Sequence, residues 1–245
     1  MTGRGRSQAG ITLLELLISV TLLSLLVAGV LVSMRVGVSA LQRTNARVIA
    51  NRRAVGAQRV LEQQIAGLMP VIADCVASGG PTQKIPFFQG EPGTVRFVSS
   101  YSLNEGSRGI PRILEFAIIP GEGSQGFRLI VNEHIYSGNL SAGRFCTGVV
   151  PDPVVGIPLP SFVPVQVGTN SFVLADKLAG ARFVFREPLN DPPFERWVGR
   201  WVQPYWPTAI RVEMTAMEAD TSKITPTNIM LPIFVNRSPL GTYYD

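Results

Sequence analysis

The sequence is poor in the residue types that most enzymes use for chemistry. Its 245 residues include one histidine, His134, and two cysteines, which do not form a CxxC pair. The missing pair argues against thiol redox chemistry and against a zinc site. A lone histidine favours neither a metal site nor a Ser/His/Asp set, and no GxSxG motif occurs. We expect His134 to be a surface or hydrogen-bonded residue, in a protein that is not an enzyme and holds no metal or cofactor.

Two further motifs are incomplete. The segment "GEGSQG", Gly121 to Gly126, matches GxGxxG, but a dinucleotide site needs a helix after these glycines. The next residues, "FRLIVNE", are typical of a strand, so the glycines predict a hairpin turn. The acids near Asp191 and Asp220 lack the dense spacing of oxygen ligands in a calcium loop.

Acidic residues are scarce beside the arginines of the N-terminal third. The net charge is +5, and one run of arginines is balanced only by Glu62. The run consists of Arg35, Arg43, Arg47, Arg52, Arg53 and Arg59. A basic patch can bind nucleic acid or anionic lipid, or it can be a solvated or subunit-facing side of a helix. No aromatic residue lies between these arginines to stack on bases, so we do not expect nucleic acid as a partner.

Proline is absent between Met1 and Met69, and an apolar run fills much of this interval. From Ile11 to Met34 the only charged residue is Glu15. At about 1.5 Å per residue the run reaches roughly 36 Å, enough to cross a bilayer core of about 30 Å. The small residues Ala9 and Gly10 precede the run, whereas a cleaved secretory signal carries them after it. We therefore predict a transmembrane helix preceded by a short cytoplasmic leader.

The arginines that follow the run outnumber those before it, which on the positive-inside rule would keep the remainder of the chain in the cytoplasm. That rule weakens for large domains, so we expect a single pass with export of the remainder. Beyond the run, Leu61, Ile65, Leu68 and Ile72 have the spacing of an apolar helical stripe. The helix is predicted to continue through residues 35–75.

After Pro70 the pattern changes to short alternating runs that are typical of antiparallel strands. The predicted strands are Thr94–Ser99, Arg112–Ile119, Phe127–Asn132, Ser171–Ala175, Ala181–Glu187, Trp197–Gln203, Ala209–Met217 and Met230–Asn236. The proline-rich Pro151–Pro164 predicts a loop or a sheet edge. The expected fold is α+β, with a long N-terminal helix packed on an antiparallel sheet.

Two pairs of residues in this β-rich part leave alternatives open. Cys75 and Cys146 form a disulfide in an oxidising compartment or are two independent buried thiols; the exported location favours the bond. Trp197 and Trp201 are four residues apart and share one face of the predicted strand. They serve core packing, which we favour, or a partner surface.

Gly10 followed by "ITLLELL" resembles the leader of type IV pilins and type II secretion pseudopilins. The family pattern is a glycine before the cut, an apolar first mature residue and glutamate as the fifth. Gly10, Ile11 and Glu15 occupy these places. The resemblance implies that a prepilin peptidase cuts between Gly10 and Ile11 and N-methylates Ile11, and that Glu15 acts in assembly.

The C-terminal segment "LAGARFVFREPLNDPPFERWVGRWVQPYWPTAIRVEMTA" resembles the J-type minor pseudopilins, in which a strand, a W…W segment and a proline-initiated strand follow in this order. The implied organisation is a leader (1–10), an assembly helix (11–34), its continuation (35–75) and a periplasmic β-rich domain (76–245). The implied setting is the bacterial inner membrane, and the implied partners are membrane lipid, the I-, K- and H-type minor pseudopilins, the major pseudopilin and secreted cargo.

Glu15 has a physical explanation within this hypothesis. A carboxylate in hydrocarbon costs about 2.5 to 3.5 kcal/mol. Cleavage would create an amine at Ile11, one helical turn away, to pair with Glu15 in the same or a neighbouring chain. The alternatives are a minor type IV pilin for adhesion, motility or DNA uptake, and a binding protein or hydrolase with an uncut signal anchor.

Overall fold

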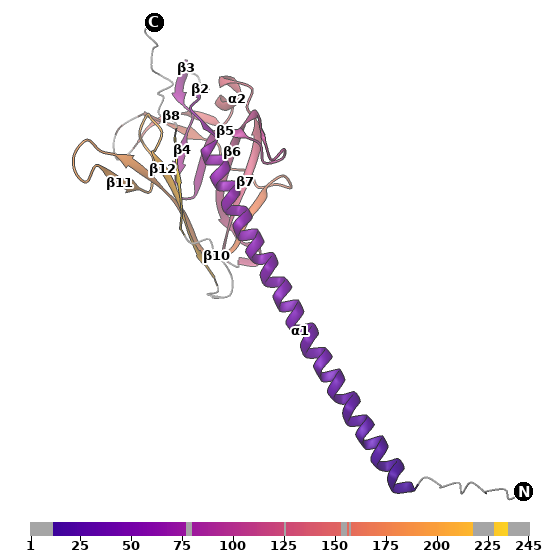
Figure 1. The fold of residues 1–245 in the computed structure, drawn as a ribbon. Helices are drawn as coiled ribbons and strands as arrows, with labels where there is room; N and C mark the ends of the chain where they lie inside the picture. The colour runs from indigo at the N-terminus through magenta and orange to yellow at the C-terminus, as the bar shows by residue number, and fades with distance from the viewer. Residues whose placement is uncertain are drawn as a thin grey trace, which may run out of the picture. The chain divides into compact units, whose positions relative to one another are not determined.

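The computed structural model describes residues 12–76, 80–124, 126–152, 156, 158–217 and 228–234. Its elements are α1 (Leu13–Ala66), β1 (Leu68–Met69), β2 (Ile72–Val76), β3 (Thr82–Pro86), β4 (Gln89–Glu91), β5 (Thr94–Tyr101), β6 (Arg108–Pro120), the 3-10 turn η1 (Glu122–Ser124), β7 (Phe127–Ile135), α2 (Asn139–Gly143), β8 (Cys146–Pro151), β9 (Pro158–Phe162), β10 (Phe172–Pro188), β11 (Glu195–Val198), β12 (Ala209–Ala216) and β13 (Asn228–Pro232) (Figure 1). The predicted α+β class, a long apolar helix followed by an antiparallel sheet, is confirmed. The chain forms two compact units, Met1–Ile49 and Ala50–Asp245.

The helix ends at Ala66, so the prediction that it continues to residue 75 is wrong. The Gly67 carbonyl accepts a hydrogen bond from the Ser100 N–H (2.8 Å), which starts the pairing of β1 with β5. A Cβ at Gly67 would lie 2.6 Å from the Tyr101 ring, so only glycine lets the chain approach β5 this closely. Pro70 then prevents a return to helix, and Ile72 begins β2.

The main sheet has nine strands, all paired antiparallel, and seven of them follow the order β1-β5-β6-β7-β10-β12-β13. Strand β4 pairs with β5, and β11 pairs with β10. The two predicted strands over 171–187 are one strand, β10. It pairs first with β7 and then with β12, and register shifts between Val173 and Gly180 accompany the change of partner. The predicted strand over 197–203 extends only to Val198, where β11 ends.

The "GEGSQG" segment joins β6 to β7 as a hairpin, as predicted. The Gly121 N–H donates to the Gly126 carbonyl (2.8 Å), and Gly126 has a φ of 67°. A Cβ at Gly126 would lie 2.2 Å from the Leu178 carbonyl oxygen. This glycine is therefore required by the turn and by the neighbouring strand.

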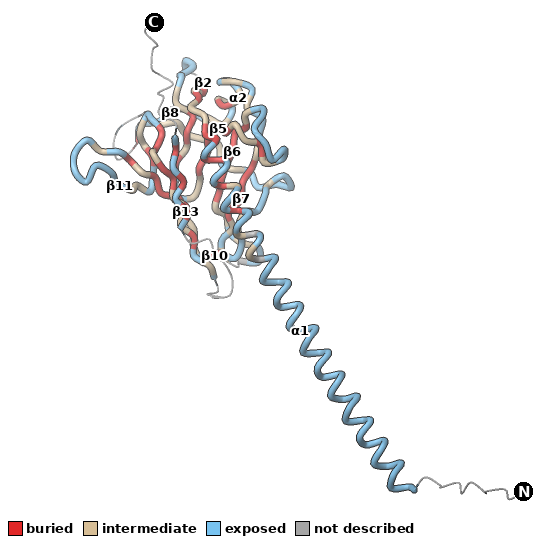
Figure 2. Tube along the Cα trace, viewed as in Figure 1, coloured by how far each residue is buried: buried red, intermediate tan, exposed pale blue. Residues whose placement is uncertain are grey.

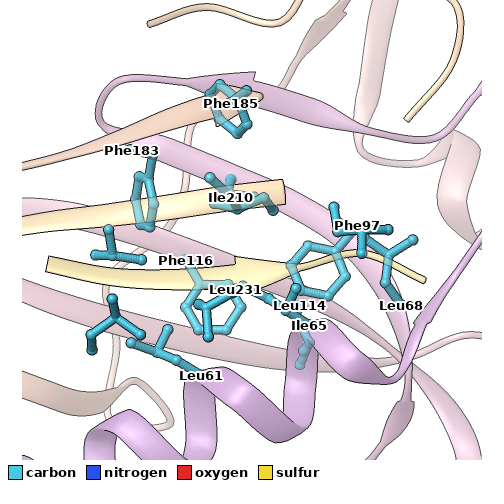
Figure 3. Packing of buried hydrophobic residues seen from close by; sticks show 14 of the residues in the cluster. Leu61, Ile65, Leu68, Phe97, Leu114, Phe116, Phe183, Phe185, Ile210 and Leu231 are labelled. Carbon is cyan, nitrogen blue, oxygen red and sulfur yellow. The ribbon is translucent and has the colours of Figure 1, made fainter. Parts of the chain in front are cut away.

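One face of the sheet packs against the last turns of α1. Figure 3 shows Leu61 and Ile65 beside Phe97, Leu114 and Phe116. All five side chains are at most 3% exposed. Their alternation along β5 and β6 follows the period of two that a half-buried strand requires. The end of α1 is thus a part of the core of the second unit.

The opposite face of β5, β6 and β7 carries a smaller layer made of α2 and the two-stranded sheets β2-β3 and β8-β9. Cys75 of β2 and Cys146 of β8 form a disulfide across 71 residues of sequence. The described part of the proline-rich segment contains the strand β9, which pairs with β8 in a separate two-stranded sheet and is not a strand of the main sheet. The disulfide therefore holds this layer together at the point where β2 meets β8.

Candidate functional site

The part of α1 in the first unit exposes an apolar surface that none of the described residues covers. Every residue from 12 to 49 is exposed, and Figure 2 shows this length of helix in pale blue. Leu13 is 84% exposed and Leu25 is 70% exposed. By length and composition this is the one helix among the described residues that could cross a membrane. Contiguous apolar surface of this extent marks contact with lipid or with other chains.

Hydroxyl side chains within this surface are bonded to the helix itself. Ser19 donates to the Glu15 carbonyl (2.7 Å), Thr21 to the Ile18 carbonyl and Ser24 to the Thr21 carbonyl (both 2.8 Å). Such bonds to the preceding turn satisfy the hydroxyl protons without water. These three hydroxyl groups are therefore compatible with a hydrocarbon environment.

Glu15 lies in the first turn of α1, where the helix dipole favours an acid. The Glu15 N–H donates to Thr12 Oγ1 (3.3 Å), and the Leu16 N–H donates to the Thr12 carbonyl (3.2 Å). Thr12 thus stands at the N-cap, and the spacing T-x-x-E is that of a capping box. Sequence reasoning missed Thr12, although this spacing was readable as a signal. In such a box the residue at the Glu15 position is the one whose side chain accepts from the N-cap N–H, which would be a local role besides any pairing with an amine.

The two other residues of the predicted cleavage site, Gly10 and Ile11, lie outside the described residues. The expected contact between Glu15 and an amine at Ile11 therefore stays a prediction. The arginines of the run are placed in α1, and Arg35, Arg43, Arg47, Arg52 and Arg59 are exposed. No carboxylate of the described residues forms an ion pair with any of these five.

A row of buried polar side chains crosses β5, β6 and β7 beneath the smaller layer. Arg96 opposes Glu115, and Glu115 opposes Asn132 in the strand register. The Arg96 guanidinium donates through Nε to Glu115 Oε1 (2.8 Å) and through its terminal nitrogens to Glu115, to Gln89 Oε1 (2.6 Å) and to the Val163 carbonyl (2.9 Å). Its carbon Cζ lies 5.3 Å and 5.2 Å from the ring centroids of Phe145 and Phe162.

Burial lowers the pKa of Arg96 from its ordinary value, and the Glu115 carboxylate only partly offsets this effect. For Glu115, burial alone would raise the pKa, but the hydrogen bond with His134 and the charge of Arg96 together hold it below its usual value. Glu115 is thus a carboxylate at neutral pH, and it faces a guanidinium that keeps its proton in proteins. Their position indicates a structural role, which is to fix the 145–166 segment on the sheet.

The lone histidine, His134, belongs to this row. Its Nε2 lies 2.9 Å from Glu115 Oε2, and its ring packs against Phe145 with 5.1 Å between centroids. It is a hydrogen-bonded residue, as the sequence suggested. Among the described residues, no three His, Cys, Asp or Glu side chains gather in a group that could hold a metal ion.

The two tryptophans do not share a strand face, because only Trp197 lies in β11. Trp201 follows the strand, is 6% exposed, and donates from Nε1 to the Tyr205 carbonyl (2.6 Å). Trp197 is half-buried, and the Arg211 guanidinium lies 4.3 Å from its ring centroid. Trp201 therefore serves core packing, as expected, while Trp197 lines the outer side of the sheet.

Comparison with known families matches residues 5–31 to the prokaryotic N-terminal methylation motif. This range includes Gly10, Ile11 and Glu15 and extends into the exposed apolar surface of α1. This motif, matched over 27 of the 245 residues, is typical of type IV pilins and pseudopilins. The helix is compatible with single-pass membrane anchoring. A search of curated proteins finds no match.

Proposed function

We propose that the chain is a J-type minor pseudopilin, a non-enzymatic subunit at the tip of the pseudopilus of a type II secretion system. The observation that carries this proposal is the exposed apolar helix with one acid in its first turn, within the matched methylation motif. The J-type assignment is supported by the order of β10, the Trp197–Trp201 segment and the proline-initiated β12.

The mechanism begins with proteolysis of the leader. Hydrolysis of the Gly10–Ile11 peptide bond consumes one water molecule and leaves a carboxylate on Gly10 and an ammonium group on Ile11. N-methylation keeps the Ile11 nitrogen basic, so that its positive charge remains available to Glu15. A carboxylate and an ammonium group that pair in hydrocarbon offset part of the cost that each alone would incur.

Assembly then replaces lipid by protein around α1. The exposed side chains from Leu13 to Met34 lie in the inner membrane before assembly and pack against sister helices as the filament grows. Outside lipid, each Å² of apolar surface removed from water contributes about 25 cal/mol. The second unit remains in the periplasm, where it contacts the I-, K- and H-type partners or the cargo.

The test must separate the charge of Glu15 from its place in the capping box. Glu15→Gln keeps a capping-box residue but removes the charge, whereas Glu15→Ala removes both. We expect both variants to insert into the membrane and both to fail to enter the pseudopilus, because neither can pair with the Ile11 amine. Incorporation of Glu15→Gln at the wild-type level would show that capping, and not the charge, explains this acid.

Mass spectrometry of the native N-terminus distinguishes the rivals. A chain that begins at N-methylated Ile11 is the expected result, and an intact Met1 would instead identify an uncut signal anchor. Deletion of the gene should abolish enzyme export. If export continues and pili lose DNA binding or adhesion, the chain is a minor type IV pilin and the secretion role is wrong.

A further inference from the structure

We propose that the arginine-bearing stretch of α1, residues 35–59, docks against a helix of a different subunit that presents carboxylates to it. The proposal rests on the proposed function, because it needs α1 to stand among other helices. It adds the chemistry of the neighbour, which is an acidic protein helix and neither a second copy of this chain nor a phospholipid.

The charge of this stretch has one sign only. Between Leu16 and Leu61 there are six arginines and no aspartate or glutamate. The same interval contains no lysine, and the first lysine of the chain is Lys84. Arginine is enriched in protein interfaces and lysine is depleted, because the planar guanidinium binds a carboxylate with two parallel bonds and loses less solvation. A merely solvated helix face would use both cations and intersperse acids.

The structure leaves these arginines available to a partner. Arg35, Arg43 and Arg47 are exposed and form no ion pair with any described residue. Exposed apolar side chains lie between them, including Val36 at 62% and Leu41 at 62%. Apolar side chains interleaved with arginine form a surface that a complementary helix can cover and that water alone does not favour.

The distances along the helix argue against phospholipid as the occupant. Arg35 directly follows the apolar run, and a headgroup layer is only about 5 to 8 Å thick. At about 1.5 Å per residue, Arg43 lies roughly 12 Å and Arg47 roughly 18 Å beyond Arg35. With a Debye length of about 8 Å, anionic lipid can attract the first two, but it does not account for Arg47 or for the arginines that follow it.

A second copy of the chain is also a poor occupant. A parallel neighbour in register would place arginine beside arginine over the whole stretch. A copy shifted along the helix axis would offer only Glu15 or Glu62, which flank six cations. Like charges at helix-neighbour distances are destabilising, and desolvation increases the cost. The neighbour must therefore be a different chain with acids at corresponding positions.

The experiment introduces a photo-crosslinking amino acid at Gln42 or Asn45 of the full-length chain in the membranes of its own host. The cross-linked peptides are identified by mass spectrometry. The expected product joins this chain to a different membrane-anchored subunit, at a helical segment with an Asp or Glu within one turn of the linked residue. The double reversal R43E/R47E should lower the yield roughly three- to tenfold.

Two matched variants keep the result interpretable. R43K/R47K preserves charge and should lose less than R43E/R47E, while K84E/R144E makes the same change of net charge on exposed residues of the second unit and should lose nothing. Replacing the linked acid of the partner by arginine should restore the yield of R43E/R47E.

A product with phospholipid, with a second copy, or with a segment lacking acids would overturn the inference, as would an R43E/R47E yield equal to wild type. If these results occur while the chain begins at Ile11 and supports export, the proposed function stands and only the acidic neighbour is wrong. An uncut leader removes the proposed function itself.

Discussion

Arg96 has no exposed side-chain surface, so its charge depends on the groups that surround it. Glu115 supplies the opposite charge, Gln89 and Val163 each accept one further hydrogen bond, and two aromatic rings cover the guanidinium. A buried ion pair of this kind adds little net stability over an apolar pair, but removal of one partner leaves an uncompensated charge. Removal of either charged member of this row should therefore destabilise the second unit.

Glu115→Gln should destabilise the second unit by about 3 to 5 kcal/mol, because it keeps the shape of the side chain and strands the Arg96 cation. The measurement is urea unfolding followed by tryptophan fluorescence in a chain that begins at Arg35. Glu122→Gln is the matched control, since Glu122 pairs with Arg128 at the surface and should produce no measurable change. Equal midpoints for Glu115→Gln and wild type would contradict this role.

The Glu115 carboxyl group also predicts that the stability of the second unit depends on pH in the acid range. Its folded pKa lies below the ordinary value of about 4.3, so its contribution to stability is present above that value. The contribution is lost as the pH falls from there through the lowered folded pKa. Wild type should lose stability over this interval more steeply than Glu115→Gln, as measured by unfolding midpoints between neutral and strongly acid pH. Parallel curves for the two proteins would show that Glu115 is not the responsible group.

At the scale of elements, the short helix α2 packs so closely on β2 that it leaves no room for a side chain. A Cβ at Gly143 would lie 2.1 Å from the Asp74 carbonyl oxygen, which is backbone and cannot move aside. Gly143→Ala should therefore destabilise the second unit by about 1 to 3 kcal/mol. Gly180→Ala is the control, because nothing lies within 4 Å of its Cβ position. Thermal unfolding that ranks the two variants equally would refute the close contact.

The disulfide acts on the same layer. It closes a loop across 71 residues, for which the loss of chain entropy in the unfolded state stabilises the fold by about 4 kcal/mol. The double variant Cys75→Ser/Cys146→Ser should lower the free energy of unfolding by that amount. Protease should then cut the smaller layer, made of α2 and the sheets β2-β3 and β8-β9, before it cuts the main sheet. Limited proteolysis with mass mapping checks the order of cleavage. First cuts within β10 or β12 would show that the layer does not depend on the bond.

Local sequence patterns predicted most helices and strands. They failed where strand pairing between distant segments overrides the local periodicity. The alternation in "TAIRVEMTA" gave β12 correctly because strand faces repeat every two residues. Leu68 and Ile72 continue the helical spacing of Leu61 and Ile65, yet both form strands. Leu68 belongs to β1, which pairs with β5, and Ile72 belongs to β2, which pairs with β3, so strand pairing outweighs the local pattern. The end of α1 was therefore not predictable from periodicity alone.

Some residues of the candidate site were likewise predictable from the local sequence, and others were not. Glu15 was predictable because a single acid in an apolar run is a local anomaly, and the cap at Thr12 was equally local although it was overlooked. The row of Arg96, Glu115 and Asn132 was not predictable, because 19 and 17 residues separate its neighbours and only the strand register brings them together.

At the scale of the whole molecule, α1 serves two environments. Its residues up to 49 are exposed throughout, whereas Ala57, Leu61 and Ile65 are at most 6% exposed and belong to the core of the second unit. A helix divided in this manner has one end suited to lipid or partners and another that the sheet needs for its own stability. The two ends should therefore respond differently to truncation.

A chain that begins at Arg35 should be soluble and should unfold cooperatively, because it keeps the core residues of α1 and loses the apolar run. A chain that begins at Gly67 should not fold stably. Burial of Leu61 and Ile65 contributes about 3 to 6 kcal/mol, a large part of the roughly 5 to 15 kcal/mol that holds a domain folded, and their loss also uncovers Phe97 and Leu114. Calorimetry together with binding of a hydrophobic dye compares the two chains. A shared melting temperature and equal dye binding would show that the sheet does not need α1, in which case the whole helix would be free to pack among partners.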